Sequence, residues 1–171
     1  MSFLSNVSDF ASSLSHAQSD SGSSSESQDS LFNTAISHLD SRKHEYSETE
    51  PEVDEEGYMR AHQSVFDGEG ETHDSGTVGT GAAMQALKMF TSGSGGGGGG
   101  GMDKNVMIGM AMSQAGKLWE EKNGQGSVSG DKQSAVNSAA EAAMKMYIKS
   151  QYGIGGTGGP SGLMGMASKF L

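Results

Sequence analysis

Few side chains in this sequence have types and spacings that could perform catalysis. The chain has no cysteine, which excludes disulfides, thiolate metal sites and cysteine nucleophiles. No serine lies in an elbow motif with a suitable histidine and aspartate. No two of the five histidines share a metal-ligand spacing on a helix: His16, His38, His44, His62 and His73. We therefore expect a protein that is not an enzyme and that has no cofactor and no metal.

Two stretches resemble ligand-binding loops without meeting their requirements. Gly76, Gly79 and Gly81 precede an expected helix, but their spacing is not Gly-x-Gly-x-x-Gly and no Lys-Ser/Thr follows. A flexible loop over residues 68–80 is therefore favoured over a phosphate-binding loop. Residues 67–74 alternate acids in the manner of a calcium loop, but they lack the glycine and the final glutamate of an EF-hand. A solvated acidic loop is the favoured interpretation, and weak divalent-ion binding is the alternative.

Three hydroxyl groups lie in the sequence context of acidophilic-kinase targets. Ser23, Ser47 and Thr49 each have a glutamate at position +3. Phosphates there would deepen the negative charge and could tune the choice of partner. The alternative is that a serine-rich acidic linker matches this pattern by accident.

An amphipathic N-terminal helix is expected over residues 2–18, with a nearly uncharged, serine-rich opposite face. Its apolar face carries Phe3, Leu4, Val7, Phe10 and Leu14. This composition is typical of helices that insert into loosely packed membranes. A helix of this length is marginal alone in water, so docking on the protein's own core or on a partner is favoured over membrane contact.

Charge divides the chain in two. Residues 1–77 contain 16 acids and 3 bases, residues 78–171 contain 5 acids and 8 bases, and the net charge is -10. The acidic front half argues against nucleic acid as a ligand, because phosphate would repel it. We expect residues 1–77 to be an acidic, partly disordered region with short helices, and residues 78–171 to be a helical domain.

Hydrophobic spacing predicts an all-α fold of short helices joined by glycine-rich loops. In the front half, a helix capped by Asp29 or Ser30 is expected, followed by one that starts at a Thr-x-x-Glu capping box over residues 49–52 and ends near Gly68. In the back half, helices over 82–90, 106–122, 135–152 and 163–171 are expected to form a four-helix cluster, with Asp131 or Ser134 capping the third. The run 106–122 is apolar on two sides, which predicts that it is the central helix.

Methionine is unusually common, with 12 residues, and methionine-rich surfaces adapt to varied partners. The candidate interaction or core face consists of Met107, Met110, Met112, Leu118, Trp119, Met144, Tyr147 and Ile148. Ala-Ala-Met occurs at 82–84 and again at 142–144, and a Gly-Met-Ala run at 109–111 recurs at 165–167. These repeats indicate a duplication of a helix hairpin over residues 82–119 and 142–171, although low-complexity composition can imitate one.

Several segments resemble a fungal family of small, glycine-rich, uncharacterised proteins known as beta-flanking proteins. The likeness rests on the segments 82–90 (AAMQALKMF), 108–112 (IGMAM), 132–136 (KQSAV), 143–147 (AMKMY), 162–164 (GLM) and 166–171 (MASKFL), and more weakly on 30–32 (SLF). The resemblance implies a fungal, intracellular, helical protein. It brings no catalytic residue and no ligand.

These observations predict a non-catalytic interaction or scaffold protein, or a stress-related one, in the cytoplasm. It would use methionine-rich helix faces to bind itself or another protein. The first alternative is a peripheral membrane protein attached through residues 2–18. The second is a desiccation-type protectant, which the two-sided apolar run 106–122 argues against.

Overall fold

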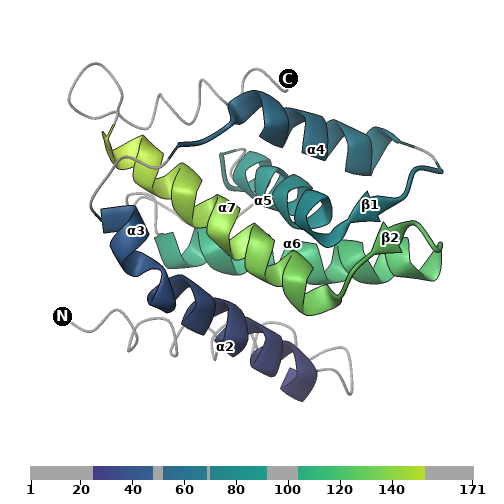
Figure 1. Ribbon diagram of the computed structural model, residues 1–171, viewed down its shortest axis with the longest axis horizontal. Coiled ribbons are helices and arrows are strands. Elements are labelled where there is room, and N and C mark those ends of the chain that lie inside the picture. The colour runs from purple at the N-terminus through teal and green to yellow at the C-terminus, as the bar shows by residue number, and fades with distance from the viewer. Residues whose placement is uncertain (1–24, 48–51, 69, 92–103, 153–171) are drawn as a thin grey trace.

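The computed structural model describes residues 25–47, 52–68, 70–91 and 104–152, which form six helices and two short strands (Figure 1). In chain order they are α2 (Ser25–Ser41), α3 (Lys43–Ser47), α4 (Glu55–Asp67), β1 (His73–Asp74), α5 (Ser75–Thr91), α6 (Lys104–Gly124), β2 (Val128–Ser129) and α7 (Lys132–Tyr152). The all-α prediction is confirmed. Helices α5, α6 and α7 supply three members of the expected C-terminal cluster. The fourth, over residues 163–171, lies outside the described residues.

The central helix is α5, which packs against α4, α6 and α7 (Figure 1). Lys88 is its only charged residue, so almost every face of the helix can be covered by neighbours. The prediction that α6 is central was therefore wrong. Helix α6 does bury residues on two sides, but its main helical contacts within the described ranges are with α5 and α7.

The predicted flexible loop over residues 68–80 is wrong from Ser75 onward, where α5 begins. Asp74 provides the start signal, because its side chain accepts a hydrogen bond from the Thr77 backbone N–H at 2.7 Å. A Cβ atom on Gly79 would lie 2.7 Å from Cβ of Ser138 and 2.9 Å from the backbone N of Ala139. Glycine is present because the backbone of α7 crosses α5 too closely for a side chain, and not because the chain must bend there.

Helices α4 and α2 complete the bundle from the acidic front half. Helix α4 packs on α5, and α2 packs on α7 along a different edge of the molecule (Figure 1). In α2 the buried side chains are Phe32, Ala35, Ile36 and Leu39, which are spaced as one helix face. They belong to the same buried cluster as the residues of α5, α6 and α7. The structure thus places no domain boundary at residues 77/78, a position that lies inside α5.

Three helices begin at an aspartate that bonds to the N–H three residues later. Asp54 accepts from Gly57 at 2.9 Å, and Asp131 accepts from Ser134 at 2.6 Å, as Asp74 does in α5. The expectation for Asp131 is confirmed. The capping box predicted over residues 49–52 does not start α4, because Asp54 is the residue that satisfies its first turn.

A short parallel strand pair, which the sequence pattern did not reveal, joins the starts of α5 and α7. His73 pairs with Val128, and Asp74 pairs with Ser129. Gly130, which directly follows β2, has φ +99, and a Cβ there would lie 3.2 Å from Cβ of Ser75. The Ser75 hydroxyl donates to the backbone carbonyl of Asp131 at 2.8 Å. The two helix starts are thus held together by backbone and hydroxyl hydrogen bonds.

Candidate interaction surface

The outer face of α4 carries the exposed apolar side chain on which a binding role can be argued. The inner face of this helix is used for folding, because Val65 is fully buried and a Cβ on Gly81 of α5 would lie 3.1 Å from the Ala61 carbonyl oxygen. On the outer face Arg60, Gln63 and Phe66 are exposed. With 43% of its surface exposed, Phe66 is the one exposed large hydrophobic residue in the described part of the chain.

The ring of Phe66 is held in place by a residue anchored to the core. Its centroid lies 4.7 Å from that of the His62 imidazole, with the planes tilted by 30°. Nε2 of His62 lies 2.9 Å from Oε1 of Gln85 on α5, so a hydrogen bond to the neighbouring helix holds the imidazole. The exposed aromatic ring is therefore a supported platform rather than a loose side chain.

Negative charge surrounds this platform. Residues 52–74 contain eight acids and one base, Arg60, whose guanidinium lies 3.6 Å from the Glu56 carboxylate. The last turn of α4 contains no basic residue, although the C-terminal end of a helix dipole is itself negative. Asp67 and Glu71 are exposed there and form no ion pair with any described residue. The surface beside Phe66 thus carries uncompensated negative potential.

A second ionic feature, centred on Glu141 of α7, is structural. Its carboxylate lies 2.9 Å from Nη1 of Arg42, 2.8 Å from Nζ of Lys145 and 3.6 Å from Nε2 of His38. Lys145 follows Glu141 by four residues, a separation at which oppositely charged side chains meet on one face of a helix. Burial raises the pKa of Glu141, but the hydrogen bond and charge of Lys145, the charge of Arg42 and the hydrogen bond from His38 outweigh it, and the net pKa is lowered. This saturated carboxylate joins the end of α2 to the bundle.

Two tyrosines close to this carboxylate are kept neutral. Burial, and next the negative charge of Glu141, raise the pKa of Tyr46 and of Tyr58 to about 12. The Tyr46 hydroxyl is buried without a hydrogen-bond partner. A buried hydroxyl without a partner lowers the stability of the fold, and a catalytic hydroxyl would need a partner, so Tyr46 serves packing.

The fold also brings together a serine and a histidine that sequence spacing did not connect. Oγ of Ser64 lies 3.1 Å from Nδ1 of His73, which is 96% buried, and Nε2 of His73 has no partner. A catalytic dyad needs its histidine beside a space for substrate. The surface depression found among the described residues is lined by residues of α2 and does not include His73. In the same residues no three histidine or acidic side chains gather as a metal site.

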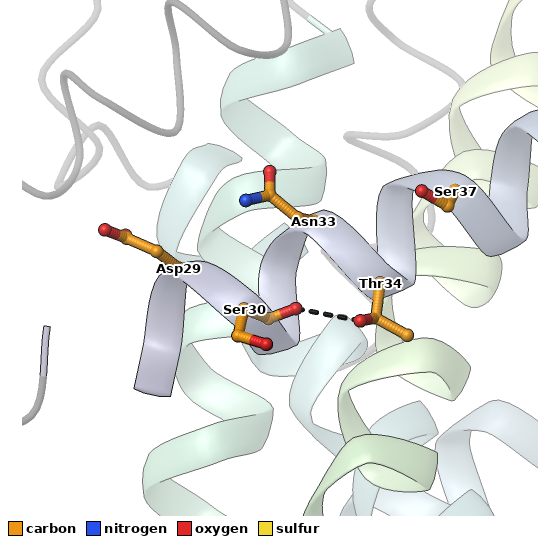
Figure 2. Close-up of a pocket in the computed structure, with 5 residues that line it drawn as sticks. All are labelled: Asp29, Ser30, Asn33, Thr34 and Ser37. Atoms are coloured by element: carbon orange, nitrogen blue, oxygen red, sulfur yellow. Dashed lines mark hydrogen bonds between the residues drawn. The ribbon is translucent and has the colours of Figure 1, made fainter. Parts of the chain in front are cut away.

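A depression on the surface lies along α2 and offers little chemistry. It is lined by Asp29, Ser30, Asn33, Thr34 and Ser37, and Figure 2 shows their side chains ranged along the polar side of that helix. The Thr34 hydroxyl is already bonded to the Ser30 carbonyl at 2.9 Å. The lining has one charged group and no aromatic ring, so it lacks the apolar walls of a small-molecule site.

The methionine-rich face proposed from the sequence is core. Met107, Met112, Leu118 and Met144 are buried, and the remaining members Met110, Trp119, Tyr147 and Ile148 are half-buried against the same cluster. The indole N–H of Trp119 donates to the Gly130 carbonyl at 3.3 Å. The sequence left open whether these residues form a core or an interaction face, and the structure supports the core.

The other predicted site residues lie outside the part of the chain that can be described. This is true of the whole N-terminal apolar face, Phe3, Leu4, Val7, Phe10 and Leu14. It is also true of Ser23 and Thr49 and of the side chain of Ser47 at the end of α3. Membrane contact and phosphorylation therefore stay predictions.

Helical spacing alone does not identify Phe66 as a site residue, because it groups Phe66 with the apolar residues of α4. Tyr58, Ala61, His62 and Val65 already fill that side at helical spacing. Phe66 is one position further on, rotated by about 100° from Val65 and next to Asp67. The charged residue directly after Phe66 was thus the sequence signal that this side of the helix is exposed.

The structure is that of a helical bundle whose acidic helix α4 carries a supported, exposed aromatic residue, Phe66, as a candidate binding surface. Residues 9–95 match the family described as Domain of unknown function (DUF7721), and the chain belongs to that family. The match includes α2 to α5 but neither α6 nor α7. No curated protein and no solved structure is detectably similar to the chain. Within the described ranges no helix has the length and apolar character needed to cross a membrane.

Proposed function

We propose that this protein is a non-catalytic interaction protein of the cytoplasm that binds a protein partner through the outer face of α4. The observation that carries the proposal is Phe66, a large aromatic side chain that is 43% exposed and yet fixed by stacking on His62. Aromatic residues are enriched at the centres of interfaces, where they bury much area at low entropic cost. The protein would then act as a scaffold component of the kind expected from its sequence.

Methionine is not the basis of this proposal. The long methionines of α5, α6 and α7, such as Met84, Met107 and Met146, are buried in the cluster that holds the bundle together. A side chain that holds the core cannot also be offered to a partner. Half-buried Met59 lies seven residues before Phe66, on the same side of α4, and would extend the contact.

Site-specific photo-crosslinking in cells tests the proposal. A crosslinking amino acid replaces Gln63, which is exposed between Met59 and Phe66. The matched control replaces Gln125, an exposed glutamine in the turn after α6. We expect one identified protein to be captured from position 63 and not from position 125, and capture to be lost when Phe66→Ser is added. Equal capture from both positions, or capture that survives Phe66→Ser, would refute a docking role for α4.

The same experiment distinguishes self-association from a different partner, because a captured second copy has the mass of the protein itself. Relationship to the fungal beta-flanking proteins stays part of the proposal and is supported by the segments quoted above. Attachment to a membrane through residues 2–18 stays a prediction from the sequence, since that segment is outside the described residues.

A further inference from the structure

The C-terminal end of α4 has features that favour one kind of side chain in a partner. The side chain of Phe66 is 43% exposed, Asp67 follows it at the end of α4, and Glu71 lies just beyond the helix. Oε2 of Glu71 lies 3.3 Å from the position that a Cβ of Gly68 would take, so this carboxylate is folded back against the helix end. Asp67 is the last residue of the helix. An aromatic ring and two carboxylates are thus grouped around one helix terminus.

The helix terminus adds to this negative potential. The N–H of Gly68 bonds back to the Ser64 carbonyl at 3.0 Å, and Gly68 itself has an extended backbone, with φ -78 and ψ 97. It is not the left-handed cap that commonly satisfies the last carbonyls of a helix. Acids are unfavourable at this end, because the helix dipole is negative there. Asp67 and Glu71 therefore occupy a position that stability alone would not select.

We propose that Phe66, Asp67 and Glu71 bind an arginine side chain in a basic segment of the partner protein. A guanidinium stacks on an aromatic face more readily than an ammonium group and is more weakly hydrated. Its planar fork also matches carboxylate oxygens. This inference rests on the proposed function and adds the chemistry of the partner to it.

Charge complementarity argues for a basic partner rather than a second copy of this chain. Three lysines on the described surface are already paired within the chain: Lys132 with Glu120, Lys145 with Glu141 and Lys149 with Glu55. The chain has a net charge of -10, so two copies repel each other as they approach. A segment rich in arginine from another protein has neither disadvantage.

Titration of the ¹⁵N-labelled full chain with a short Gly/Ser peptide containing several arginines tests the inference by NMR. The same peptide with lysine, and with citrulline as a neutral isostere, serves for comparison. We expect amide shifts concentrated between Met59 and Glu71, weaker binding of the lysine peptide and no binding of the citrulline peptide. Citrulline binding as tight as arginine binding, or shifts spread over the whole acidic surface, would overturn the inference.

Variants locate the contact. Phe66→Ala should weaken binding of the arginine peptide about threefold, as expected for an exposed cation–π contact. The double variant Asp67→Asn/Glu71→Gln should weaken it about fivefold. The control Asp29→Asn/Glu121→Gln, which removes one charge from α2 and one from α6, should change it by less than about twofold. Equal losses in the two double variants would show diffuse attraction and refute the site.

A stability measurement separates binding from a structural role. Asp67→Asn/Glu71→Gln should raise the urea midpoint of unfolding, because it removes repulsion from the helix dipole, while it weakens binding. A lower midpoint would mean that these acids serve the fold. Should position 63 capture a partner that has no basic segment, the arginine inference fails and the proposed function stands. Should the arginine peptide bind as expected while position 63 captures nothing, the surface recognises arginine, but the proposed function fails and the inference of a basic partner protein fails with it.

Discussion

The tight crossing of α5 and α7 at Gly79 leads to a prediction that can be worked out in some detail. In Gly79→Ala the new Cβ would clash with the carbonyl oxygen of Ala135 and lie 2.7 Å from Cβ of Ser138. The carbonyl is backbone and cannot turn away, so α7 must move as a unit. Alanine would favour the helix by about 1 kcal/mol, but overpacking of this kind costs about 3 kcal/mol. We expect a net loss of about 2 kcal/mol in the free energy of unfolding.

A matched substitution in the neighbouring helix should have the opposite sign. Gly116 is also buried inside a helix, but a Cβ there would meet only the flexible side chain of Lys132, at 3.4 Å. Gly116→Ala should therefore stabilise the protein by about 0.5–1 kcal/mol through the helix propensity of alanine. Urea unfolding followed by far-UV circular dichroism measures both variants. Equal effects of the two substitutions would refute the view that Gly79 is required by the α5–α7 crossing.

The remaining predictions concern charge, buried hydroxyls and the extent of the folding unit. Glu141→Gln should lower the free energy of unfolding by about 1–2 kcal/mol near neutral pH. Because the pKa of Glu141 is lowered in the folded state, this difference from the natural protein should be complete above pH 4.5 and should shrink as the pH falls below that value. Urea titrations at several pH values measure it. Tyr46→Phe should raise the free energy of unfolding by about 1 kcal/mol, since it removes a buried hydroxyl without a partner, and a loss of similar size would contradict this. Because folding raises the pKa of Tyr46 and of Tyr58 from 10 to about 12, the free energy of unfolding should not depend on their ionisation below pH 10 and should fall as the pH rises towards 12, which tyrosinate absorbance during alkaline unfolding would follow. The family-matched fragment 9–95 should give a largely unfolded dichroism spectrum, because α5 would lose the two helices it packs against most; a cooperative unfolding transition in the fragment would show otherwise.

The sequence predicted those features of the fold that depend on residues close to each other along the chain. Although α2 begins at Ser25 and not after the expected cap at Asp29 or Ser30, helical spacing predicted α2, α6 and α7, and Asp131 was one of the two expected caps of α7. The ion pair of Glu141 with Lys145 followed from a four-residue separation. In each case the interacting groups are within one helical turn of each other, so the sequence contains all the information that is needed.

Features that depend on contacts between distant segments could not be predicted from the sequence. Gly76, Gly79 and Gly81 look like loop glycines until α4 and α7 are placed against them. Arg42 reaches Glu141 across 99 positions, and β1 pairs with β2 across more than 50. The candidate surface follows the same rule, because the exposure of Phe66 depends on which side of α4 the core occupies.

Composition and periodicity thus determined that this protein is helical, acidic in front and without cysteine chemistry, since these properties belong to single residues and to their neighbours along the chain. Tertiary structure decided which apolar side chains are buried in the core and which are exposed to solvent. Met107 and Phe66 are both large apolar residues on amphipathic helices, but Met107 is fully buried and Phe66 faces solvent. The physical reason is that a helix buries only the face its neighbours cover, and the positions of those neighbours are set by the whole chain.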